Sequence, residues 1–294
     1  MNKCLVTKLN GVVNNDAILK IGRMRVLFSK LKGESFQFKY NVNEEVIVEK
    51  GYITDSSYAQ NNGQNLLCEP HMQKGFYLTA DAGEISINMG YYDLDLFVAP
   101  PGSSFDIDKL CYSKLSSLTA NYCQFNTSKF PKSMPYINVL NLQGTNIEDD
   151  IAAISNYSKI ELLNLKDCYE CYGNISALSN LSSLYSCILT NTKVKGDIST
   201  LPASVRFLSL GSSQKVDWLT TRPSDSHILA LENVYLGDSV NAMLINQANC
   251  SKMYESSDPS WFKTISCIGT RTSASDAALA TLQQKGYTIS VTPA

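Results

Sequence analysis

The chain has 294 residues, of which 44% are hydrophobic, and its formal net charge is −2. This length suffices for two domains, and the composition is that of a globular protein with a substantial core. So small a charge provides no field that would attract nucleic acid or an anionic membrane, and we expect neither as a partner.

The N-terminus has no basic stretch followed by an apolar run, and no segment is apolar over the roughly 18 residues that span a bilayer. We therefore expect synthesis and folding in a reducing cytoplasm, without membrane insertion. The nine cysteines agree with this expectation. Their odd number and scattered apolar positions indicate reduced core thiols rather than a disulfide framework.

Residues 1–105 have the pattern of a β-rich domain. Strand-like segments alternate with turn signals, at residues 3–9, 17–28, 36–40, 45–48, 76–80, 85–89 and 91–98. So many short strands predict a compact β-sandwich or roll. We expect residues 56–65 to be a polar loop and residues 99–105 to link this domain to the next. Alternation in the last strand would place Leu94 and Leu96 on one face.

Residues 106–294 contain an internal repeat of the form L-x-x-L-x-L-x-x-(T/C/N)-x-(I/V). Its central positions are Leu118, Leu140, Leu163, Cys187, Leu208 and Leu229, and a last copy centres on Ile265. The first six are 21 to 24 residues apart, which lies within the period of about 20–29 residues typical of leucine-rich repeats. One repeat cannot bury its own apolar face, so stacked neighbours must complete the core.

A second signature recurs in phase with the first. Asp150, Asn174 and Asp197 each precede one turn of apolar spacing, and these residue types cap helices well. We expect a short helix at each place, on the convex side of a solenoid. Small hydrogen-bonding residues at Thr145, Cys168 and Thr192 would satisfy backbone groups where the chain leaves each strand.

The period breaks after Leu236, and residues 238–246 are predicted to form a longer helix. Residues 256–260 form a loop, 275–286 a helix that ends at Gly286, and 287–292 a strand. The predicted fold is therefore α+β: a β-sandwich-like domain over 1–105, then a leucine-rich-repeat solenoid over 106–294. A terminal cap begins at about residue 256 and covers the last open edge.

Two residue pairs resemble fragments of chemical sites. Cys68 and His71 resemble half of a zinc site, but a structural zinc needs four ligands and no second pair lies nearby. Cys168 and Cys171 form a CxxC at a repeat position that already favours cysteine. We therefore predict no catalytic residue, metal ligand or cofactor.

The concave face is the candidate binding surface, because residues between the core positions of each strand point outward. The residues singled out there are Val139, Asn141, Leu162, Asn164, Ile188, Phe207, Ser209 and Ile228. They combine an exposed apolar row with small polar neighbours, which suits contact with a protein or with sugar rings. The alternative is that a flanking loop or a neighbouring subunit covers the row.

Three stretches carry a resemblance: residues 1–16 (MNKCLVTKLNGVVNND), 21–25 (IGRMR) and 272–287 (TSASDAALATLQQKGY). Together with the repeats, they resemble leucine-rich-repeat proteins encoded by gut Bacteroides and their crAss-like phages. The resemblance implies a virion-associated protein of the head fibre or decoration type. Residues 1–105 would attach to capsid or tail proteins, and the solenoid would project outward.

The first hypothesis is thus a non-enzymatic phage structural protein, a homo-oligomer in the virion that is made in the host cytoplasm. The second is a bacterial cytoplasmic or effector protein whose concave face holds a protein partner. A third, of another class, is a transferase or hydrolase that uses Cys68 or Cys168.

Overall fold

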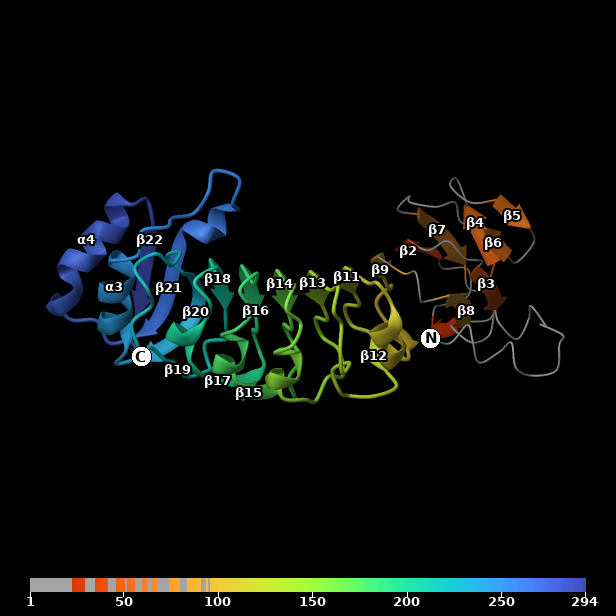
Figure 1. Cartoon of the computed structure of the whole chain (residues 1–294), viewed down its shortest axis with the longest axis horizontal. Helices are drawn as coiled ribbons and strands as arrows, with labels where there is room; N and C mark the ends of the chain where they lie inside the picture. The colour runs from red at the N-terminus through yellow and green to blue at the C-terminus, as the bar shows by residue number, and fades with distance from the viewer. Residues whose placement is uncertain are drawn as a thin grey trace.

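The computed structural model describes residues 23–29, 35–41, 46–50, 52–55, 60–62, 65–67, 74–79, 84–90, 94 and 96–294. Side chains are described for residues 25–27, 94 and 96–294. Figure 1 shows a row of strands along one side of the molecule, from β9 (Leu96–Val98) to β22 (Thr288–Thr292), and these strands belong to one long sheet. Short helices and a second, smaller sheet lie along the opposite side (Figure 1).

Among the described residues, eight strands precede the long array: β1 (Arg23–Ser29), β2 (Ser35–Asn41), β3 (Val46–Lys50), β4 (Tyr52–Asp55), β5 (Gln60–Asn62), β6 (Asn65–Leu67), β7 (Lys74–Thr79) and β8 (Glu84–Gly90). β1, β3, β5, β6 and β8 belong to one sheet, and β2, β4 and β7 to the sheet that β9 continues. The strand expected at 3–9 lies outside the described residues, and the β-sandwich stays a prediction. The loop expected at 56–65 is wrong in part, because β5 pairs with β6. Ladder bonds use the backbone, so polar side chains do not prevent them.

Parallel strands build the long array: β9 (Leu96–Val98), β11 (Ser117–Thr119), β13 (Val139–Asn141), β14 (Leu162–Asn164), β16 (Ser186–Ile188), β18 (Phe207–Ser209), β20 (Ala230–Gly237), β21 (Thr264–Gly269) and β22 (Thr288–Thr292). Their register aligns one central residue per strand, from Leu118 through Leu140, Leu163 and Cys187 to Leu208. These five side chains are fully buried and share one continuous core. The predicted leucine-rich-repeat solenoid is confirmed by this register.

The array contains one repeat that the sequence pattern did not identify. Phe97 pairs with Leu118, and Leu94 lies three residues before it, as Leu115 lies before Leu118. Leu94 and Phe97 are fully buried, whereas Leu96 is only half-buried. The expectation that Leu94 and Leu96 share a face is therefore wrong, because this segment follows the repeat spacing rather than strand alternation.

The predicted centre of the sixth repeat is also wrong by two residues. Leu208 pairs with Leu231, not with Leu229. Ile228 then takes the first apolar position of the pattern, which Val205 occupies in the preceding repeat. A register shift follows Leu231, where Asn233 adopts a positive φ of 55°. Because the bulge adds a residue to this repeat, the repeat pattern can be aligned with its centre at either Leu229 or Leu231.

Residues 99–105 do not form a linker. Ser103–Phe105 is strand β10, which pairs with β1 and with β12 (Gln124–Phe125). The Phe105 ring lies 5.3 Å from Phe97 and 5.1 Å from Phe125, measured between centroids. Such buried edge-to-face contacts belong to a core. The repeat array thus begins before the predicted boundary at residue 105.

The convex side carries the predicted short helices. They are the 3-10 helices η2 (Ile151–Ile154), η3 (Ile175–Leu178) and η4 (Ile198–Thr200), and a further one, η1 (Ile107–Tyr112), was not predicted. Asp150, Asn174 and Asp197 cap η2, η3 and η4, each accepting a hydrogen bond from the backbone two residues on. Next to them, β15 (Tyr172–Asn174), β17 (Lys193–Asp197) and β19 (Val216–Asp217) form the second sheet.

The turn residues after the strands also act as predicted. The Thr145 hydroxyl donates to the Leu142 carbonyl at 2.9 Å, and the Thr192 hydroxyl donates to Leu189 at 2.8 Å. The Cys168 thiol donates to the Leu142 carbonyl at 3.1 Å. The Leu142 and Leu189 carbonyls also accept from the backbone N–H of Thr145 and Thr192, so the side chains add further hydrogen bonds to each turn.

The C-terminal end contains α3 (Val240–Ala248), η5 (Ser260–Lys263), η6 (Ser273–Ser275) and α4 (Asp276–Gln284). α3 buries Val240, Met243 and Leu244, as its spacing predicted. The side-chain amide of Gln247 bonds to the backbone of Leu229 as a neighbouring strand would. It accepts from the Leu229 N–H at 2.5 Å and donates to the Leu229 carbonyl at 3.0 Å. The predicted helix and strand after residue 275 are confirmed as α4 and β22.

The cap residue of η3, Asn174, lies against the backbone of Gly196 in the next repeat, and substitution can test this contact. Gly196 has a φ of +110°, and a Cβ there would lie 2.3 Å from Oδ1 of Asn174, the cap of η3. Gly102 also has a positive φ, of +80°, but a Cβ there would meet nothing within 4 Å. Gly102→Ala should cost about 1–2 kcal/mol of left-handed strain. Gly196→Ala should cost about 1 kcal/mol more, because it also displaces the cap.

Urea unfolding of both variants measures the difference. Equal losses of unfolding free energy would show that the stacked cap contributes nothing.

Candidate functional site

The structure places five of the eight predicted binding residues on the concave face. Val139, Leu162 and Ile188 are half-buried there, as are Asn141 and Asn164. They lie on adjacent parallel strands, with Val139 beside Leu162 and Asn141 beside Asn164. This part of the predicted surface is therefore open to a partner.

The other three predicted residues are buried, and the expectation that they are exposed is wrong. Phe207 is 4% exposed because the Phe262 ring stacks on it, with 5.3 Å between centroids and 21° between planes. Ser209 bonds to the Thr190 hydroxyl at 2.8 Å and donates to a Glu232 carboxylate oxygen at 2.6 Å. Ile228 is buried because it occupies the first apolar position of its repeat, and Ala230 lies beside Phe207 instead.

The segment that covers Phe207 is an insertion between two repeats. Leu231 and Ile265 are neighbours in the sheet but 34 positions apart in sequence, against 21 to 24 in the preceding repeats. Residues 251–263, here called the covering segment, come back over the concave side. Its Lys252 carbonyl accepts from the Ile228 N–H at 2.8 Å. The covering segment therefore supplies one of the alternatives foreseen for the apolar row, a flanking loop.

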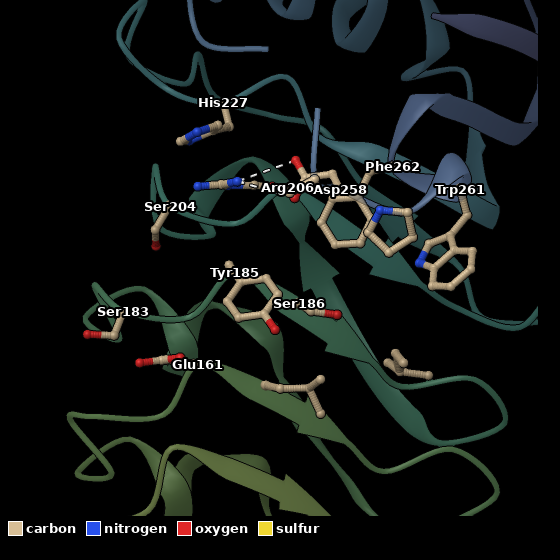
Figure 2. Close-up of a pocket in the computed structure, with 14 residues that line it drawn as sticks. Glu161, Ser183, Tyr185, Ser186, Ser204, Arg206, His227, Asp258, Trp261 and Phe262 are labelled. Carbon is tan, nitrogen blue, oxygen red and sulfur yellow. Dashed lines mark hydrogen bonds and ion pairs between the residues drawn. The ribbon is translucent and has the colours of Figure 1, made fainter. Parts of the chain in front are cut away.

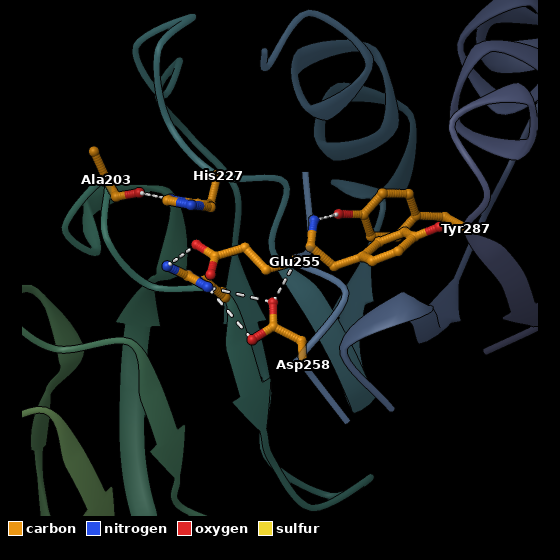
Figure 3. Close-up of polar contacts among 7 residues, drawn as sticks. Ala203, His227, Glu255, Asp258 and Tyr287 are labelled. Atoms are coloured by element: carbon orange, nitrogen blue, oxygen red, sulfur yellow. Dashed lines mark hydrogen bonds and ion pairs between the residues drawn. The ribbon is translucent and has the colours of Figure 1, made fainter. Parts of the chain in front are cut away.

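Arg206 holds the covering segment by two ion pairs. Its guanidinium lies 2.7 Å from a Glu255 carboxylate oxygen and 3.3 Å from one of Asp258 (Figure 3). The Glu255 N–H donates to Asp258 at 2.7 Å, which joins the two acids in one network. Next to Glu255 in the chain, Tyr254 is also held, because the Tyr287 hydroxyl accepts from its N–H at 3.1 Å (Figure 3).

A hollow of about 550 Å³ lies between the covering segment and the strands. Figure 2 shows Trp261 and Phe262 on the wall formed by the covering segment, with Tyr185 and Ser186 across from them. Leu162 and Ile188 add apolar surface from β14 and β16. Trp261 is 54% exposed, so its ring offers apolar surface at the hollow.

Polar groups line the opposite side of the hollow. They are Glu161, Ser183, Ser204, Arg206 and His227 (Figure 2). Burial lowers the pKa of His227, and the hydrogen bond from its Nδ1 to the Ala203 carbonyl at 3.3 Å opposes that shift only in part. His227 is thus neutral near pH 7, and the hollow offers hydroxyls, one paired cation and the carboxylates of Glu161 and Asp258.

The paired thiols have the environment of core residues. Cys168 and Cys171 are fully buried, and burial raises the pKa of both, that of Cys171 to about 12. A thiol with a raised pKa is a poor nucleophile, which weakens the hypothesis that Cys168 is catalytic. Cys68 and His71 lie outside the described residues. Among the residues that the structure describes, no three His, Cys, Asp or Glu side chains gather to hold a metal, and no helix could cross a membrane.

Sequence reasoning missed Trp261 and the covering segment. Two signals were available: the long interval between Leu231 and Ile265, and an aromatic pair, Trp261 and Phe262, next to a polar loop. The first is visible in either register, because Ile265 follows the predicted centre Leu229 by 36 positions.

No family model matches the chain, and no curated protein matches it. The crystal structure of internalin C2 from Listeria monocytogenes is similar at 19% identity and a TM-score of 0.44. The similarity covers 65% of this chain and 80% of that one. It does not support the phage group, and the leucine-rich-repeat assignment rests on the strand register of the protein itself.

Proposed function

We propose that this chain is a non-enzymatic leucine-rich-repeat module that binds a protein partner on its concave face. The hollow beneath the covering segment is the anchor point. The observation that carries this proposal is Trp261, a half-exposed tryptophan on the wall of that hollow.

The residue types around the hollow favour a protein partner. Tryptophan, tyrosine and arginine dominate the binding energy of protein interfaces, and Trp261, Tyr185 and Arg206 line one cavity here. Apolar surface from Leu162 and Ile188 suits an apolar side chain of the partner, and the serine hydroxyls suit its backbone. A sugar could also stack on Trp261, so a glycan is the competing ligand that the experiment must separate.

Replacement of Trp261 by alanine should remove the anchor. Peptides selected from a random displayed library against the wild-type chain should bind Trp261→Ala more weakly by about 2 kcal/mol, or roughly 30-fold in Kd. Titration calorimetry measures this loss. Tyr169→Ala is the matched control, because Tyr169 is 62% exposed but lies outside the hollow.

A second readout uses the two tryptophans of the chain. Trp218 is buried, away from solvent, and its replacement in a Trp218→Phe variant leaves Trp261 as the source of tryptophan emission. This emission should shift to shorter wavelength when a peptide binds. Peptide binding that is the same in Trp261→Ala as in the control contradicts the proposal. Retention on a glycan array that depends on Trp261, without peptide binding, would favour the sugar.

The hollow exists only while the covering segment is held down. Arg206→Ala removes both ion pairs, so amide hydrogen exchange over residues 252–262 should accelerate by roughly an order of magnitude. Lys193→Ala is the control, because the Lys193–Glu170 pair is more than half exposed on both sides and should matter little. Unchanged exchange in Arg206→Ala would show that the aromatic stack alone holds the covering segment.

We also propose, from the resemblance of residues 1–16, 21–25 and 272–287, that the module is displayed on a phage particle made in the host cytoplasm. Residues 1–105 would attach it to capsid or tail proteins. Many copies on one particle would convert a weak site into avid binding. Mass spectrometry of purified particles should then find the chain at a fixed copy number, and its absence from particles leaves the bacterial binding protein as the proposal.

A further inference from the structure

The last strand of the array has an open edge. β22 pairs with β21 on one side and ends the order of the long sheet on the other, within the part of the chain that the structure describes. Figure 1 places β22 with α4 at the far end of the solenoid from β9. An open edge presents unpaired backbone N–H and C=O groups that can accept another strand. The predicted cap therefore covers the core but leaves this backbone edge available.

Within Thr288–Thr292 this edge has no residue of the kinds by which proteins usually block pairing, and Pro293 follows only after the strand. Natural edge strands carry lysines, prolines, bulges or inward charges. β22 reads Thr-Ile-Ser-Val-Thr and pairs with β21 in continuous register, without a bulge. β21, which reads Thr-Ile-Ser-Cys-Ile-Gly, has no charged side chain either.

The surface next to the edge is equally poor in charge. From Ala277 to Ala294 the sequence contains one charged residue, Lys285, in a chain of which 18% is charged. The Lys285 ammonium is held at 2.8 Å by the carbonyls of both Ala248 and Cys250. Depletion of charge is the compositional mark of the central part of a protein interface. The end of the solenoid is therefore suited to be covered.

We propose that β22 pairs antiparallel with β22 of a second copy of this chain, forming a two-fold dimer. Ser290, the middle residue, would face its own counterpart across the two-fold axis. Ile289 would then face Val291 of the other copy, and Thr288 would face Thr292. Apolar side chains thus meet apolar ones and hydroxyls meet hydroxyls, with no like charges opposed.

The exposure of β22 agrees with this arrangement. Ile289 and Val291 pack against the core but remain only partly buried, whereas Thr288, Ser290 and Thr292 are exposed. Pairing would complete the burial of the two apolar side chains and leave the hydroxyls on the accessible face. The sheet would then continue from one solenoid into the other. No residue that lines the hollow belongs to β21 or β22, so the dimer does not depend on the proposed function.

Sedimentation equilibrium of the full chain tests the dimer. The mass should rise from 32.4 kDa toward twice that value as the concentration increases to the order of 100 µM. Ser290→Lys should stay monomeric, because two lysines would face each other across the axis. Ser182→Lys, at an exposed position outside β22, is the matched control and should associate like the wild type.

An equimolar mixture identifies the partner as a second copy. Ser290→Lys and Ser290→Glu should each be monomeric, and together they should regain the wild-type mass, because opposite charges then meet at the axis. This rescue also shows that both variants are folded. A wild-type chain that stays at 32.4 kDa at every concentration overturns the proposal. So does a Ser290→Lys variant that associates as the wild type does.

Discussion

Within the repeat array, the core forms between repeats rather than inside any one of them. Each repeat contributes one buried central residue, such as Leu140, and the side chains of its two neighbours close the space around it. The backbone follows the same rule, since each short strand from β11 to β21 pairs with a strand on either side of it. The convex caps extend the stacking to the far side, where the backbone of Gly196 leaves room for Asn174. The register between neighbouring strands consequently determines which side chains of each repeat are buried and which lie on its surface.

The candidate site arises where this regularity is interrupted. After Leu231 the chain departs from the period, and the extra residues return over the concave face as the covering segment. Arg206, on a regular repeat, holds that segment through Glu255 and Asp258, so the hollow joins a repeat surface to an irregular one. A regular array supplies shallow surface, and the insertion adds the depth and the exposed Trp261 that a specific contact needs.

The sequence predicted what depends on local spacing. The repeat phase, the caps at Asp150, Asn174 and Asp197, and the terminal helix and strand all follow from residues close together in the chain. The centre of the sixth repeat did not, since the apolar residues that follow fit a centre at Leu229, and only Ile228 before it indicates Leu231. The burial of Phe207 was out of reach for another reason: it depends on a contact with Phe262, 55 positions later, and no local pattern determines the path of an insertion. The surface at Val139, Leu162 and Ile188 was predicted because only repeat phase sets it.

The position of the hollow has an evolutionary consequence. It is lined by residues of β14 and β16, by residues just before β18 and β20, and by an insertion that follows β20, whereas β11 and β13 contribute none of its lining residues. Since each repeat contacts only its neighbours, whole repeats can be gained or lost near β11 without disturbing the residues around Trp261. Such changes would alter how far the hollow stands from the N-terminal strands and leave its chemistry as it is. The distance of the hollow from the N-terminal strands and its binding specificity can thus change independently among descendants of this chain.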